Sequence, residues 1–115
     1  GFTTVVPSDG MVASGGTDLF LAGVERILKD GACVGVHSWS TGRYEGKDFP
    51  RSDPEHQMYL SYYAAMGIPQ DFYWFTLEAA PAAEIHWMTA KEVNRYDMTT
   101  SKAGELGGNA ACDNR

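Results

Sequence analysis

The chain has 115 residues, enough for one domain with a modest core, and 43% of them are hydrophobic while 21% are charged. This composition is typical of a soluble globular protein and excludes a disordered chain. The net charge is −6 and the basic residues are scattered singly, so we expect no nucleic-acid binding through a basic stripe. The longest apolar run, residues 19–24, is far too short to span a membrane.

The first third of the chain predicts short strands and one helix. The β-branched run 3–6 is a strand that ends at the turn sequence 7–10. A helix is expected over 17–23, with an acid in its first turn and a glycine at its end. Residues 24–28 prolong that helix or form a strand. We prefer a strand, because it can make a hairpin with the buried strand 32–37 across the turn 29–31.

The middle of the chain predicts a polar loop followed by two helices. Residues 38–51 have no periodicity. Ser52 and Glu55 have the spacing of a capping box, which predicts a helix that runs to Met66 and stops at Gly67. Its apolar face is expected to hold the following residues: Met58, Tyr59, Tyr62, Tyr63 and Met66. A second helix is expected from residues 69–71 to about residue 80.

The last third predicts one more short helix and a loose end. Thr89 and Glu92 form a second capping box, which opens a helix to about Tyr96. Residues 103–115 are rich in Gly, Asn and Ala and are expected to be a flexible tail. The alternation of strands and helices indicates the α/β class.

The segment Ala13-Ser14-Gly15-Gly16, between an expected strand and an expected helix, is the sharpest chemical signal. A serine at this position can expose its hydroxyl while the next backbone N–H faces the same space, as a nucleophile with an oxyanion donor requires. Serine is also a common helix N-cap, which is the simpler interpretation of this segment alone. The pattern is not the Gly-x-Ser-x-Gly elbow of α/β-hydrolases, because residue 12 is valine.

His37 ends the apolar strand and is the candidate base, because imidazole is the usual partner of a serine nucleophile. The simpler alternative is a histidine that caps the strand and bonds to Ser38 or Ser40. His56 is expected to be solvated, and His86 to pack beside Trp87.

Two further groups of residues carry weaker signals. Cys33 and Cys112 could form a disulfide, but spacing alone does not show it, and Cys33 is most simply a small buried hydrophobe. No His or second Cys lies near either one, so neither a zinc site nor a cofactor is expected. The aromatic cluster over 59–75 predicts core between two helices, or else the lining of an apolar groove.

Together these segments resemble the Clp-protease/crotonase superfamily, in particular the bacterial periplasmic proteins described as ClpP-like. Ala13-Ser14-Gly15-Gly16 is similar to the sequence that holds the family's nucleophile, and Val34-Gly35-Val36-His37, 23 residues later, is similar to the segment that holds its base. Residues 87–96 look like the helix-opening segment that follows the family's acid. The resemblance implies that residues 1–102 are the C-terminal portion of a ClpP-like domain, incomplete because upstream βα units are missing.

This chain departs from the family pattern at the acid and at the oxyanion hole. The family's aspartate falls on Ile85; Glu84 is adjacent, although on an extended backbone its side chain would point elsewhere. The site is therefore a Ser–His dyad, a triad with an acid such as Glu84, or inactive. The Gly-Gly segment that supplies the family's other oxyanion donor would lie before Ser14, which leaves only Gly15 N–H here.

The resemblance implies a serine hydrolase of the peptidase kind, in which Ser14 attacks and His37 moves the proton. The alternatives are a non-catalytic assembly or binding domain on the same scaffold and, last, crotonase-type acyl-CoA chemistry. Expected partners are a peptide or protein substrate and further copies of the chain, in a periplasmic or membrane-associated location. Because an oxyanion segment is absent, we expect residues 1–115 alone to turn over little substrate.

Overall fold

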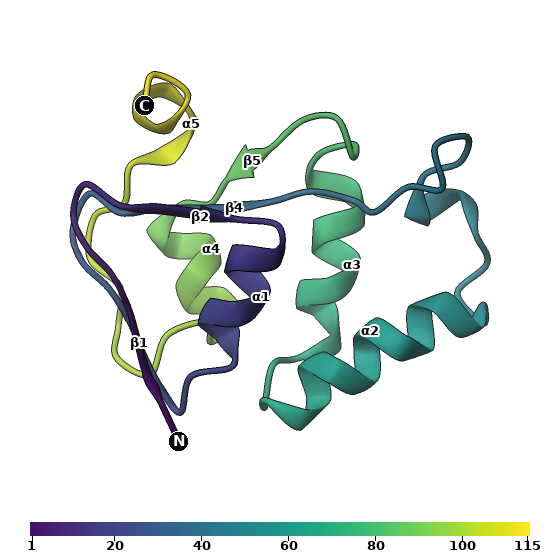
Figure 1. Ribbon diagram of the computed structural model, residues 1–115, viewed down its shortest axis with the longest axis horizontal. Helices are drawn as coiled ribbons and strands as arrows, with labels where there is room; N and C mark the ends of the chain where they lie inside the picture. Colours follow the sequence, from purple (N-terminus) through teal and green to yellow (C-terminus); the bar gives the residue numbers. More distant parts are fainter.

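Two pairs of short parallel strands carry the N-terminal third of the protein. In this computed structural model, which describes residues 1–115, β1 (Thr3–Val6) pairs with β3 (Glu25–Leu28) and β2 (Met11–Ala13) pairs with β4 (Cys33–Val36). The helix α1 (Gly15–Leu21) connects β2 to β3. Figure 1 shows that β1 runs at a steep angle to β2. The chain changes sheet three times between β1 and β4, because the strands alternate between the two sheets.

The predicted hairpin between 24–28 and 32–37 is wrong, although both segments are strands. β3 and β4 belong to different sheets, and each pairs in parallel with a strand about twenty residues earlier in the chain. The turn at Gly31, where φ is +90°, bends the chain from one sheet into the next instead of folding β4 back on β3. This difference matters for function, because parallel pairing brings the ends of β2 and β4 to the same edge.

The helices predicted after residue 52 are confirmed, with one change of cap. They are α2 (Pro54–Ala65), α3 (Gln70–Ala79) and α4 (Ala90–Arg95), and α4 has the predicted capping box. In α2 the cap is Asp53 instead of Ser52, because the Asp53 carboxylate accepts a hydrogen bond from Glu55 N–H at 2.9 Å. The 3-10 helix η1 (Gly46–Asp48) and the two-residue strand β5 (His86–Trp87) complete the mixed α/β fold.

The buried face of α2 differs from the predicted one. Met58 and Tyr62 are exposed, whereas His56, expected in solvent, is fully buried. The His56 ring bonds through Nδ1 to the Tyr73 hydroxyl at 2.6 Å and through Nε2 to the Phe49 carbonyl at 3.3 Å. A buried imidazole is tolerated here because both of its nitrogens have partners.

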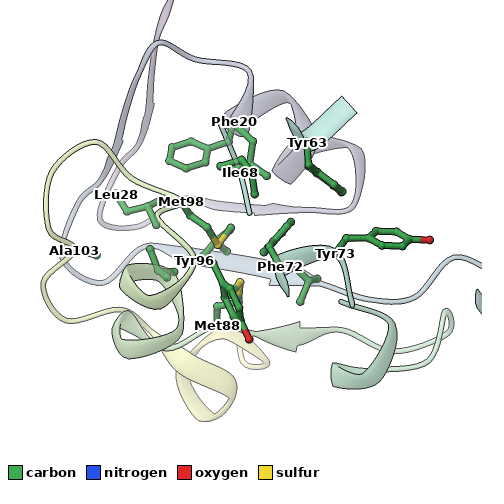
Figure 2. Close-up of a cluster of buried hydrophobic side chains, with 14 of the residues drawn as sticks. Phe20, Leu28, Tyr63, Ile68, Phe72, Tyr73, Met88, Tyr96, Met98 and Ala103 are labelled. Carbon is green, nitrogen blue, oxygen red and sulfur yellow. The ribbon is translucent and has the colours of Figure 1, made fainter. Parts of the chain in front are cut away.

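The main core lies between the β2–β4 sheet and the helices on one side of it. Figure 2 shows Phe72, Met88 and Met98 meeting near its centre, with Phe20 beside them. Tyr73 belongs to the same cluster but directs its hydroxyl away from the centre. Part of the predicted aromatic cluster therefore belongs to the core. The Tyr73 side chain extends from this core toward the site described below.

The C-terminal residues, expected to be a flexible tail, contain the short helix α5 (Gly108–Cys112) on the opposite side of the sheet from α1 and α4 (Figure 1). A disulfide joins Cys112 to Cys33 of β4. Trp87 N–H donates to Asn109 Oδ1 at 2.8 Å, and the Trp87 indole N–H donates to Asp113 at 2.9 Å. These bonds hold the end of the chain against β4 and β5, a placement that composition alone did not predict.

None of the helices combines the length and the apolar content needed to cross a bilayer. No group of His, Cys, Asp or Glu side chains is arranged to hold a metal ion.

Candidate active site

Ser14 and His37 meet at one edge of the β2–β4 sheet. Ala13 pairs with Gly35, so Ser14 follows directly after β2 and His37 follows directly after the end of β4. Because the two strands are parallel, their carboxyl ends lie side by side, which is where open α/β sheets place ligands. The Ser14 hydroxyl and His37 Nε2 are hydrogen-bonded to each other.

The Ser14 side chain does not cap the helix that follows it. Ser14 occupies the N-cap position of α1, but its hydroxyl makes no capping hydrogen bond and is turned to His37 instead. The simple capping interpretation of this serine is therefore wrong. The residue is also exposed, so its hydroxyl is accessible from solvent.

The backbone of Ser14 is strained. Its φ of +54° and ψ of −121° lie outside the regions that residues with a side chain ordinarily occupy. Such conformations cost about 1–3 kcal/mol and cluster at functional sites. A serine on a sharp, strained turn between a strand and a helix is also the geometry that exposes the nucleophile in α/β-hydrolases.

A glycine at this position should relieve the strain. Ser14→Gly and Ser14→Ala both remove the hydroxyl, but we expect the glycine variant to be more stable than the alanine variant by about 1 kcal/mol, or roughly 4 °C in Tm. Thermal unfolding of the two variants measures the difference. As a control, Ser61 lies exposed inside α2, where Gly should instead be less stable than Ala by about 1 kcal/mol. If the glycine variant has the lower Tm at position 14 as well as at position 61, the Ser14 backbone is unstrained.

The orientation of the His37 ring is set by the backbone. His37 Nδ1 bonds to the Ser38 carbonyl at 2.8 Å. A carbonyl oxygen can only accept, so Nδ1 carries the proton and Nε2 presents its lone pair to the Ser14 hydroxyl. Ser38 is itself buried and fixed, because its N–H donates to Ala80 at 2.9 Å and its hydroxyl donates to the Trp39 carbonyl at 2.8 Å.

A buried hydrogen bond ties the helix that follows Ser14 to the strand that precedes His37. The Thr17 hydroxyl donates to the Gly35 carbonyl at 2.7 Å, and Thr17 is only 2% exposed. Because Thr17 lies on the first turn of α1 and Gly35 lies two residues before His37, this bond fixes the separation of the two candidate catalytic groups.

The structure does not bring Glu84 to His37. Glu84 is exposed in the turn before β5, and the Nδ1 position that an acid would occupy is taken by the Ser38 carbonyl. Continuing the β4–β5 register places Ile85 opposite His37, so an apolar side chain stands at the position expected for the acid. The other histidine outside the core, His86, instead forms an ion pair with Glu92 at 2.9 Å.

An open cleft of about 160 Å³ extends from Ser14 and His37. One part of its lining comes from the first turn of α1 and the end of β4. The other part is a group of aromatic side chains: Trp39, Tyr59, Tyr63, Phe72 and Tyr73. Four residues of the predicted aromatic cluster, Tyr59, Tyr63, Phe72 and Tyr73, therefore line a groove as well as contributing to the core, and Trp39 joins them there.

Asp18 is the cleft residue that the sequence analysis missed. It lies one turn after Ser14 on α1, and its Oδ1 accepts a hydrogen bond from the Tyr63 hydroxyl at 2.7 Å. Burial raises the pKa of Asp18 above its usual value, and the Tyr63 hydrogen bond and nearby His37 offset part of that rise. The four-residue spacing from Ser14 is a helical signal that could have indicated it.

Comparisons with protein-family models, with curated proteins and with solved structures find no match to this chain.

Proposed function

We propose that this chain carries the active site of a serine hydrolase that cleaves peptides or related acyl compounds, built on a scaffold like that of the ClpP-like proteins. The observation that carries the proposal is the hydrogen bond between Ser14 and His37 Nε2 at the carboxyl ends of two parallel strands. The strained Ser14 backbone supports it, because a structural cap would not require strain.

In the proposed reaction the Ser14 oxygen forms a bond to the substrate's carbonyl carbon while its proton moves to His37 Nε2. The tetrahedral intermediate then breaks its bond to the leaving group, which takes the proton from Nε2. Water repeats the two steps on the acyl-enzyme and regenerates the Ser14 hydroxyl. Gly15 N–H opens α1 without an intrahelical acceptor and can donate to the oxyanion.

The catalytic set proposed here is a dyad whose third member is a main-chain carbonyl. The Ser38 carbonyl holds the His37 tautomer, as an aspartate would, but adds no full negative charge to stabilise the imidazolium. Glu84 is left out of this set because it is exposed and Nδ1 is already bonded.

The experiment is covalent labelling of Ser14 by a fluorophosphonate, which requires a reactive serine but no complete turnover. We expect one label per chain, on the peptide that contains Ser14, and no label on Ser14→Ala. The matched control is Ser61→Ala, which removes an exposed serine of α2 and should label like the wild type. Equal labelling of Ser14→Ala and the wild type would end the proposal.

A non-catalytic binding or assembly domain on the same scaffold is the second candidate. Ile85 at the position expected for the acid favours it, as does the single oxyanion donor. Exposed apolar side chains on the N-terminal side also suit contact with further copies of the chain, since Phe2 is 80% and Val24 64% exposed and their backbones are hydrogen-bonded to each other. If this second candidate is correct, the fluorophosphonate should label no serine of the chain, whether the chain is a monomer or an oligomer.

The Cys33–Cys112 disulfide supports a location outside the cytoplasm, because disulfides persist in oxidising compartments such as the periplasm.

A further inference from the structure

The cleft beside Ser14 combines one carboxylate with a row of aromatic rings. Trp39 and Tyr59 are stacked with ring centroids 6.0 Å apart, and Tyr59 and Tyr73 are stacked at 5.5 Å. All three rings line the cleft, and so does Asp18. Aromatic faces and a carboxylate attract the same kind of group, a cation, the first through the ring quadrupole and the second through its charge.

Asp18 has no cationic partner within the protein. The only ion pair in the chain joins His86 to Glu92, and no Lys or Arg lines the cleft. The neighbours of Asp18 from the helix packed against it are tyrosines: the Tyr63 hydroxyl donates to its carboxylate at 2.7 Å and the Tyr62 hydroxyl donates to its carbonyl at 2.9 Å. A partly buried carboxylate that is paired with no Lys or Arg is stabilised when a cation enters.

The distance from Ser14 to Asp18 matches the length of a long cationic side chain on the substrate. Asp18 follows Ser14 by four residues at the start of α1, which places it about 6 Å further along the helix axis. The four-carbon stem of a lysine covers about the same length between its backbone and its ammonium group. A substrate whose carbonyl carbon lies at the Ser14 oxygen can therefore bring the ammonium of that residue to Asp18.

We infer that the cleft selects substrates with a lysine or arginine side chain at the bond that is cleaved, with Asp18 as the specificity-determining residue and Trp39, Tyr59 and Tyr73 as the walls. This inference rests on the proposed hydrolase function for its reactive step, but the cation site itself does not need that step. The overall charge of −6 gives the same preference at longer range.

The first arm of the test uses two peptidyl diphenyl phosphonates that differ only in the side chain at phosphorus, one like lysine and the other like norleucine. Ser14 oxygen bonds to phosphorus, phenoxide leaves, and the proton passes through His37 to the phenoxide. We expect the lysine probe to label at least about ten-fold faster, and Asp18→Asn to reduce this preference to about two-fold. The charge control is Asp71→Asn, an exposed position in the first turn of α3.

Asp18→Asn is a mild change, because an amide oxygen still accepts the Tyr63 hydrogen bond and no buried charge remains. The inference is overturned if the two probes label equally, or if Asp18→Asn slows both by the same factor. The second result would mean that Asp18 acts on His37 and not on the substrate. A preference that Asp71→Asn reduces equally would also overturn it, since it would be a property of net charge.

The second arm separates this inference from the proposed hydrolase function. Amide chemical shifts of Ser14→Ala are followed during titration with n-butylammonium and, in parallel, with n-butanol. Saturable shifts on α1 with the ammonium alone, lost in Ser14→Ala/Asp18→Asn, support the cation site even if no phosphonate labels. If Ser14 labels but n-butylammonium does not bind, the proposed hydrolase function stands and the inferred cation site is rejected.

Discussion

His37→Ala is expected to slow the reaction of Ser14 with a fluorophosphonate by about 10²–10⁴-fold, the usual contribution of a positioned general base. The physical reason is that Nε2 is the only acceptor bonded to the Ser14 hydroxyl. Without it, no positioned base removes the hydroxyl proton as the new bond to phosphorus forms. The rate is measured as labelled fraction against time at several probe concentrations. Added imidazole should restore part of it, because the deletion leaves a space beside Ser14.

The control and the combined variant make this result specific. His86→Gln removes a histidine that pairs with Glu92 and makes no hydrogen bond to Ser14, and it should label at the wild-type rate. Ser14→Ala/His37→Ala should carry no label, which would assign any slow labelling that remains in His37→Ala to the Ser14 oxygen. Wild-type labelling of His37→Ala would mean that the hydrogen bond to His37 has no role in activating Ser14.

Loss of the disulfide is expected to have the largest effect on stability. The bridge closes a loop with a sequence separation of 79 residues, and the chain-entropy model assigns about 4–5 kcal/mol to a loop of this size. We expect Cys33→Ala/Cys112→Ala to lower Tm by about 16–20 °C, since a domain of this length loses roughly 4 °C per kcal/mol. Thermal unfolding with and without a reducing agent gives the same comparison in the wild type.

The disulfide variant should also lose local order before it unfolds. Trp87 holds α5 through Asn109 and Asp113, and the Arg115 guanidinium donates to the carbonyls of Gly31, at 2.7 Å, and Gly10, at 3.1 Å. Without the bridge, only hydrogen bonds such as these and the backbone bond from Gly107 N–H to the Ala32 carbonyl hold the end of the chain. Hydrogen exchange at the Trp87 indole should therefore rise in the variant. An unchanged exchange rate and Tm would show that the polar contacts alone hold α5 in place.

The predictions that succeeded were those whose signal is local. The Thr89–Glu92 capping box, the stop of α2 near Gly67, with φ at +74°, and the limits of α3 all depend on neighbouring residues. The cap predicted for α2, Ser52, is wrong, and the reason again lies in neighbouring residues. Asp53 stands directly before Pro54, the first residue of the helix, and its carboxylate is the better-placed acceptor for Glu55 N–H.

The predictions that failed needed a partner far along the chain. The hairpin was inferred from a turn signal at 29–31, but a turn sequence fixes only the local change of direction and not the strand that pairs. A position on the first turn of a helix predicts that the His56 side chain lies in solvent. It is buried because Tyr73, on α3, supplies its hydrogen-bond partner.

The residues of the candidate site also fall into those that the local sequence indicates and those that depend on a distant partner. Ser14, Gly15 and His37 were found from their residue types and their order, and the structure brings Ser14 and His37 together. Glu84 is a candidate acid only because it is next to Ile85 in the sequence, and it lies exposed while His37 Nδ1 bonds to the Ser38 carbonyl. Asp18 was overlooked because its meaning depends on the tyrosines of α2, which lie more than forty residues away in the chain.

The amino-acid order by itself determined most of the strands and helices, though not β5 or α5, and it singled out Ser14 and His37 as candidate catalytic residues. Tertiary structure alone decided that β2 and β4 run in parallel with their ends together, that a main-chain carbonyl orients the imidazole, and that Cys112 returns to β4. The reason is physical: short-range propensity and capping act over a few residues, whereas strand pairing, burial and desolvation depend on groups that only folding brings into contact.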